Sequence, residues 1–159
     1  MGAQKVKGKF IAPNFSQGGA ALGFADVLVA NAEIKALRAT PKVLVPAPGA
    51  GKVLEFQSAV LQLKAGANVL TEATANLAVK YKDGTGVQVS QTIEATGFVD
   101  QAADQITYGL VKLDPITART VCENQPLVLH NLGAGEIAGN AANDALLRVK
   151  VAYRVHTLG

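Results

Sequence analysis

The chain has 159 residues, of which 49% are hydrophobic and 17% charged, and its formal net charge is +3 at pH 7. This length suits one domain that buries its core without metals, and the single cysteine, Cys122, excludes an intrachain disulfide. The low charged fraction favours a protein whose apolar surface is covered by another copy or a partner. Lys5, Lys7 and Lys9 alternate near the N-terminus, but the chain has neither interleaved aromatic residues nor a second basic cluster, so we expect no nucleic-acid binding.

The N-terminal residues are glycine-rich and irregular. We predict an extended arm over residues 1–24, followed by one β-domain over residues 25–159. The arm combines alternating lysines with spaced apolar side chains, and we take these as candidate partner-binding residues: Lys5, Lys7, Lys9, Phe10, Phe15, Leu22 and Phe24. Asp26 interrupts the apolar stretch that follows, so we expect no signal peptide, and no stretch approaches the length of a membrane span.

The stretch "VLVPAPGAGKVLEF", residues 43–56, is superficially similar to a phosphate-binding loop. Pro46 stands where that motif has its first glycine, and Val53 stands where a hydroxyl would hold magnesium. A β-prone run follows instead of a helix, whose N-terminus would face the phosphates. We therefore predict a proline-stiffened turn between two strands, with unusual φ values at Gly49 and Gly51.

The central part of the chain shows β-type alternation. The apolar phase slips between Val53 and Leu63, which predicts a β-bulge near Gln57 and Ser58. Residues 76–95 alternate on both sides of "DGTG" and predict a hairpin. Shorter strands are predicted at residues 26–30, 33–39, 42–46, 105–113, 117–122 and 126–131.

The strongest period-two pattern is "LLRVKVAYRVHTL" near the C-terminus, which predicts a long strand with Val149, Val151 and Val155 buried. Many short strands with almost no helical periodicity predict an all-β fold. We expect an antiparallel β-sandwich, jelly-roll-like rather than immunoglobulin-like, with the N-terminal arm outside it.

Catalytic patterns are weak. "NLGAGEIAG" partly matches a dinucleotide-binding motif, but no helix follows it, so we predict a loop. His130 and His156 fall on different predicted strands, which gives no metal site by spacing. Asp100, Asp104 and Asp114 form no convincing acid–base pair, since Asp100 and Asp104 equally suit the capping of a turn. We expect no enzyme, no cofactor, no metal and no small-molecule substrate.

Five segments together resemble small structural proteins of tailed bacteriophages, above all capsid decoration (cement) proteins. They are "VLVPAPGAGKVLEF", "NLAVKYKDGTG", "IEATGFVDQAAD", "ENQPLVLHN" and "LRVKVAYRV", within residues 40–157. The resemblance implies a protein made in the host cytoplasm that binds the major capsid protein on the virion surface. It also implies a homo-oligomer, with a trimer favoured and a dimer next. Another virion subunit, such as a tail or head fibre, and a non-viral ligand-binding β-sandwich remain alternatives.

Overall fold

Alternating apolar residues give this chain two main β-sheets. The structure is a computed structural model that describes residues 20–72, 75–113 and 117–159. Sheet A has the strand order β1-β10-β3-β7, with bounds β1 (Leu22–Ala30), β10 (Leu146–Thr157), β3 (Lys52–Lys64) and β7 (Gln105–Leu110). Sheet B has the order β2-β8-β5-β6, with bounds β2 (Lys42–Val45), β8 (Leu127–Asn131), β5 (Asn76–Tyr81) and β6 (Ile93–Glu94).

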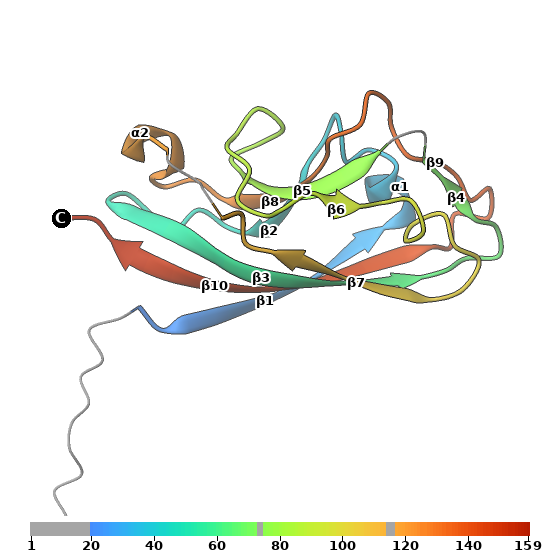
Figure 1. Ribbon diagram of the computed structural model, residues 1–159, viewed down its shortest axis with the longest axis horizontal. Helices are drawn as coiled ribbons and strands as arrows, with labels where there is room; N and C mark the ends of the chain where they lie inside the picture. Colours follow the sequence, from blue (N-terminus) through green and yellow to red (C-terminus); the bar gives the residue numbers. More distant parts are fainter. Residues whose placement is uncertain (1–19, 73–74, 114–116) are drawn as a thin grey trace, which may run out of the picture.

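Smaller elements complete the fold. β4 (Leu70–Thr71) pairs with β9 (Ala138–Gly139), and α1 (Asn31–Ile34) and α2 (Arg119–Cys122) are single helical turns. The two sheets lie one above the other (Figure 1), and every strand pair is antiparallel. The prediction of an all-β antiparallel sandwich is therefore confirmed.

Strand pairing in the two main sheets is nested. β1 pairs with β10, β2 with β8, β3 with β7, and β5 with β6. The outermost pair thus joins the first strand to the last, and the innermost pair joins two strands that are neighbours in sequence. The two edges of sheet A are consequently β1 and β7.

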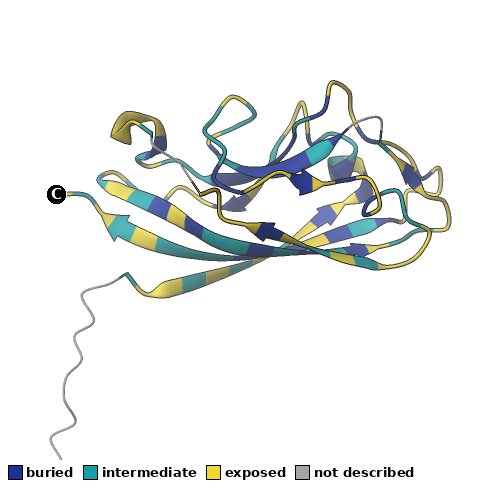
Figure 2. Cartoon of the chain, viewed as in Figure 1, coloured by how far each residue is buried: buried dark blue, intermediate teal, exposed yellow. Residues whose placement is uncertain are grey.

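The core lies between the sheets. Inward side chains such as Leu61, Val149, Val79 and Leu129 are fully buried, and their removal from water is worth about 1.5–3 kcal/mol each. β5 and β8 are dark blue along most of their length in Figure 2, because loops also cover the outer face of sheet B. Gly84, for example, lies against the imidazole of His130. Sheet A instead alternates between buried and exposed residues, so its outer face is open.

The predicted bulge in β3 is confirmed. Ser58 pairs with Ala152 and Phe56 pairs with Tyr153, which leaves Gln57 as the additional residue. The extra residue reverses the phase of the strand. Phe56 therefore faces the core together with Ala59, although the spacing between them is odd.

The turn between β2 and β3 also agrees with prediction. β2 ends at Val45 and β3 begins at Lys52, whose side chain is exposed. Gly49 and Gly51 have φ values of +100° and +72°, which residues with a Cβ atom rarely adopt. The segment is a connection between the two sheets.

Two predicted strands are wrong. Residues 33–39 comprise the end of α1 and the turn that follows it, and the Glu33 carboxylate accepts a hydrogen bond from the Ala30 N–H at 2.9 Å. This winding buries Ile34 and Leu37, which are three residues apart and so share one face of a helical turn. Residues 117–122 include α2, where Arg119 and Glu123 form an ion pair of 2.9 Å. In both segments, local hydrogen bonding outweighs β propensity.

The long C-terminal strand β10 is confirmed, and Val149 and Val151 are buried as predicted. The prediction for Val155 is wrong, since its side chain is 37% exposed. β1 begins opposite Arg154, so Val155 lies beyond the last residue that has a β1 neighbour. The predicted hairpin over 76–95 is paired at its base through β5 and β6, and Lys80 and Gln88 form an isolated bridge nearer its tip.

Candidate interaction face

The open face of sheet A carries three transverse rows of side chains, set by the register of its four strands. In each row the side chains come from β1, β10, β3 and β7 in turn. The rows are Phe24–Ala152–Ser58–Leu110, Asp26–Lys150–Val60–Tyr108 and Leu28–Arg148–Gln62–Ile106. We call this surface the outer face of sheet A.

Large apolar side chains on this face gather at its two edges. Phe24 on β1 is 74% exposed, and Tyr108 on β7 is 64% exposed. Their apolar neighbours on the same strands are also exposed, namely Leu22, Leu28, Ile106 and Leu110. Exposed aromatic and aliphatic side chains in contiguous rows are typical of binding surfaces.

The inner side of β7 explains why its apolar residues point outward. Gly109 is buried and faces the core, where an added Cβ would lie 3.1 Å from Ile93 and 3.3 Å from Ala59. Because strand residues alternate between faces, Tyr108 and Leu110 must point away from the core. At Gly109, the space between β7 and the core therefore admits no side chain without movement of the neighbouring residues.

Cations occupy the middle of the outer face. The Arg148 guanidinium binds Asp26 through two hydrogen bonds of 2.7 and 2.8 Å. These hydrogen bonds hold the pKa of Asp26 below its ordinary value and raise that of Arg148. Among the described residues, Lys150 and Lys64 have no carboxylate within ion-pair distance. The centre of the face can therefore pair with acidic groups of a partner.

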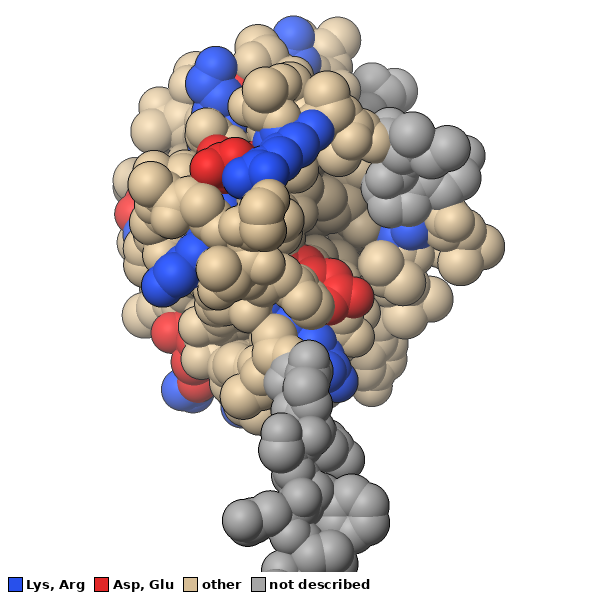
Figure 3. Space-filling model, turned by 90° about the vertical axis from the view of Figure 1, so that its left-hand side faces the viewer, with Lys and Arg blue, Asp and Glu red and all other residues tan. Residues whose placement is uncertain are grey.

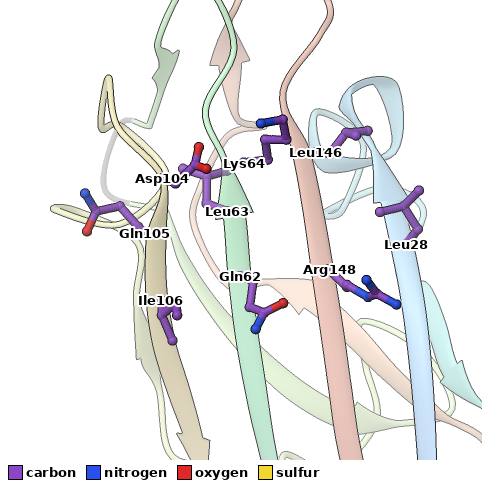
Figure 4. Close-up of a pocket in the computed structure, with 9 residues that line it drawn as sticks. All are labelled: Leu28, Gln62, Leu63, Lys64, Asp104, Gln105, Ile106, Leu146 and Arg148. Carbon is purple, nitrogen blue, oxygen red and sulfur yellow. The ribbon is translucent and has the colours of Figure 1, made fainter.

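One hollow of about 430 Å³ lies between the edges of this face. Figure 4 shows Leu28 and Ile106 on its two flanking strands, with the Gln62 amide and the Arg148 guanidinium between them. A second hollow of about 390 Å³ lies beside Phe24, Lys150 and Ala152. Apolar walls around an amide and a cation suit the insertion of a partner's side chains, and neither hollow contains a nucleophile paired with a base.

The predicted arm residues divide between two regions. Lys5, Lys7, Lys9, Phe10 and Phe15 lie outside the described residues. Leu22 and Phe24 belong to β1, so the sandwich begins at Leu22, earlier than the predicted boundary at residue 25. Both point outward, and the structure places them on one face with the missed residues Leu28, Ile106, Tyr108 and Leu110.

The histidines do not come together. His130 is buried on β8 of sheet B, and its pKa is lowered by burial and then by Lys80. His156 lies on β10 of sheet A, where its imidazole is 2.6 Å from Glu55. In the described ranges, no three His, Cys, Asp or Glu side chains form a group that could hold a metal ion.

The remaining candidate groups stabilise turns. The Asp100 carboxylate accepts a hydrogen bond from the Gly97 N–H at 2.7 Å, and that of Asp104 accepts one from the Ala65 N–H at 2.9 Å. Asp114 lies outside the described residues. Cys122 is buried, and its thiol donates a hydrogen bond to the Arg119 carbonyl at 3.3 Å.

Charges at one end of the molecule are dispersed. Figure 3 views the end of the molecule where β10 finishes, and blue and red side chains are interspersed there among tan ones.

No family model matches the chain, and neither a curated protein nor a solved structure matches it. Each helical turn, α1 and α2, has four residues, too few to cross a membrane.

Proposed function

We propose that this protein is a capsid decoration protein that binds the outside of the major capsid protein lattice and stabilises the head. The observation that carries the proposal is the outer face of sheet A, where apolar edges flank the cations Arg148 and Lys150 on a rigid sheet. Such a face binds a protein surface by shape and charge, without catalysis and without a cofactor.

The strand pairing supports the proposal. Four nested antiparallel pairs, from β1–β10 to β5–β6, are the pattern expected of a jelly roll, a fold found in viral capsid proteins. The five sequence segments that resemble decoration proteins map onto this framework. They include the β2–β3 connection, the turn after β5 and most of β10.

The N-terminal residues provide the second contact with the capsid in this proposal. β1 is an edge of sheet A and begins at Leu22, so the chain enters the sandwich at this edge. Lys5, Lys7, Lys9, Phe10 and Phe15 then supply further charge and apolar anchors to a neighbouring capsid subunit. Repetition over the shell multiplies modest affinities, provided that one oligomer contacts several subunits.

The experiment adds purified protein to heads that lack it and measures retention after sedimentation and resistance of the heads to heat. Lys150→Glu reverses a charge at the centre of the outer face and should weaken retention at least tenfold. Val121→Glu is the matched control, because Val121 is 44% exposed on α2, which lies on the side of the molecule opposite the outer face of sheet A (Figure 1). We expect this variant to bind like the parent.

A chain that begins at Ala20 tests the arm and keeps β1 whole. Reduced retention of this chain supports the second contact, and unchanged retention removes it from the proposal. Electron microscopy of the virion separates the alternatives, because a tail or fibre location contradicts a decoration protein. Absence from the virion contradicts every viral assignment and leaves the ligand-binding sandwich.

A further inference from the structure

The edge strands of sheet A, β1 and β7, lack the side chains that usually prevent strands from pairing between molecules. Natural edge strands are protected by lysine, proline or a covering loop. β7 has the sequence QITYGL without a charge, and β1 has a single charged residue, Asp26, which is bound to Arg148. Neither edge strand contains lysine or proline.

Much of each edge is also open. The free lateral edge of β7 is hydrogen-bonded near the end of the strand, where the Gln91 N–H donates to the Leu110 carbonyl. Within the described ranges, no strand pairs with the free lateral edge of residues 105–109 in β7, and none pairs with the free lateral edge of β1. With respect to the described residues, the backbone N–H and C=O groups on these sides are therefore open to another strand.

Strand direction makes the two edges complementary. Each neighbouring pair in sheet A is antiparallel, so β1 and β7 run in opposite directions. β1 of a second copy, placed beside β7 with its sheet in the same orientation, therefore continues the antiparallel order. Phe24 and Leu28 of that copy then lie on the same face as Ile106 and Tyr108.

Contact between these side chains requires two copies. Three strand spacings of about 4.8 Å separate β1 from β7, so the apolar edges of one copy are about 14 Å apart. Edge pairing brings the two apolar sets side by side as cross-strand neighbours. Stacking two outer faces would instead bring Lys150 and Lys64 of both copies together, and like-charge repulsion disfavours this arrangement.

We propose that copies of this chain associate head to tail through sheet A, with the β1 edge of one copy paired to the β7 edge of the next. Such a contact is heterologous, so it closes into a ring or continues as a filament. The cationic centre of the outer face stays free in this assembly. The inference goes beyond the proposed function and does not rest on it.

Single substitutions at exposed edge positions test the contact without threatening the fold. Phe24→Glu and Ile106→Glu each place a carboxylate at one edge, and each should reduce the mass in light scattering to that of a monomer. The control, Val121→Glu, should keep the mass of the parent. A monomeric parent, or an assembly that survives either edge substitution, would overturn the proposal.

Disulfide trapping separates this contact from a symmetric one and also detects weak association. Two chains are prepared with Cys122→Ser, one carrying Phe24→Cys and the other carrying Ile106→Cys or Tyr108→Cys. Oxidation of the mixture should yield a disulfide between unlike chains, and each chain alone should remain uncrosslinked. Homodimers of the Phe24→Cys chain would show β1–β1 pairing, and the lack of any crosslink would likewise contradict the head-to-tail contact. Because no heads are present, these results are independent of capsid binding.

Discussion

Arg148 on β10 holds Asp26 on β1 through two parallel hydrogen bonds, at 2.7 Å from Nε to Oδ1 and 2.8 Å from Nη2 to Oδ2. The pair lies on the outer face of sheet A, between the apolar side chains Phe24 and Leu28. It fixes the guanidinium in a planar, two-point geometry that a lysine could not provide. It also neutralises the only charged residue of β1, which leaves that edge apolar.

We predict that Asp26→Asn lowers the melting temperature at neutral pH and that this difference disappears in acid. Asp26 has a folded pKa below its ordinary value of 3.8, chiefly through the hydrogen bond from Arg148. Its stabilising contribution is therefore present above pH 3.8 and is lost as pH falls through the lower folded pKa. Thermal unfolding of both proteins from pH 7 to pH 2 measures this. A double-mutant cycle with Arg148→Gln isolates the pair, and a pH-independent coupling would contradict the assignment.

The alternation of β10 predicts opposite outcomes for adjacent residues. Val151 is 1% exposed, so Val151→Asp places a carboxylate in the core and should yield insoluble protein. Lys150→Asp changes an exposed side chain on the other face and should leave the chain soluble and folded. Val155→Asp should resemble Lys150→Asp, because Val155 is partly exposed. Equal solubility of the Val151 and Lys150 variants would refute the assignment of faces.

We predict that Gly51→Ala destabilises the protein by about 1–2 kcal/mol, the cost of a left-handed backbone conformation for a residue with a Cβ. An added Cβ at Gly51 meets no atom within 4 Å, so the effect arises from its φ of +72°. Gly135→Ala is the matched control, since its Cβ site is equally open and its φ is not positive. Urea unfolding should show almost no change for this control. Equal losses for the two variants would refute the conformational explanation.

Tyr81 links the two sheets, since its hydroxyl on β5 donates a hydrogen bond to the Leu54 carbonyl on β3. Tyr81→Phe leaves that buried carbonyl unpaired and should cost about 1–3 kcal/mol at pH 7. Burial raises the pKa of Tyr81 to about 12. The stability gained from its neutral form is therefore complete below the unfolded pKa of about 10 and is lost as pH approaches 12. The gap between parent and variant should narrow from pH 10 upward, and a constant gap would contradict this role.

Much of the fold follows from period-two patterns in the sequence. The alternation in β10 and the phase slip at Gln57 are properties of the strands themselves, so they are visible without the neighbouring strands. The β2–β3 turn was equally predictable, because Gly49 and Gly51 adopt conformations that other residues avoid. The wrong strand at residues 33–39 arose because Ile34 and Leu37 are buried by a helical turn that ends after four residues.

The outer face could not be fully predicted, because alternation does not reveal which side of a strand meets the core. In β7, the apolar set Ile106, Tyr108 and Leu110 alternates with Gln105, Thr107 and Gly109, and apolar residues would ordinarily be assigned inward. The structure reverses this, since Gly109 fits against Ala59 and Ile93 where a larger side chain would not. Which set of β7 residues faces the core is determined by the packing of the residues opposite this strand, and not by the sequence of the strand itself. The sequence indicates Leu22 and Phe24 as candidate binding residues, but it does not predict that they belong to an edge strand.

Nested pairing also sets the order in which the chain can fold. Leu77 pairs with Ile93 across a short loop, whereas the Arg154 side chain binds the carbonyl of Ala20 across 134 residues. Since the entropy cost of closing a loop rises with its length, we expect the β5–β6 region to form early and the β1–β10 pair late. During synthesis, β1 leaves the ribosome before the other described strands of the two main sheets, yet its partner β10 is the last of these strands to be made. Among the described strands of the two main sheets, β1 is therefore the one that waits longest for its place in the sheet.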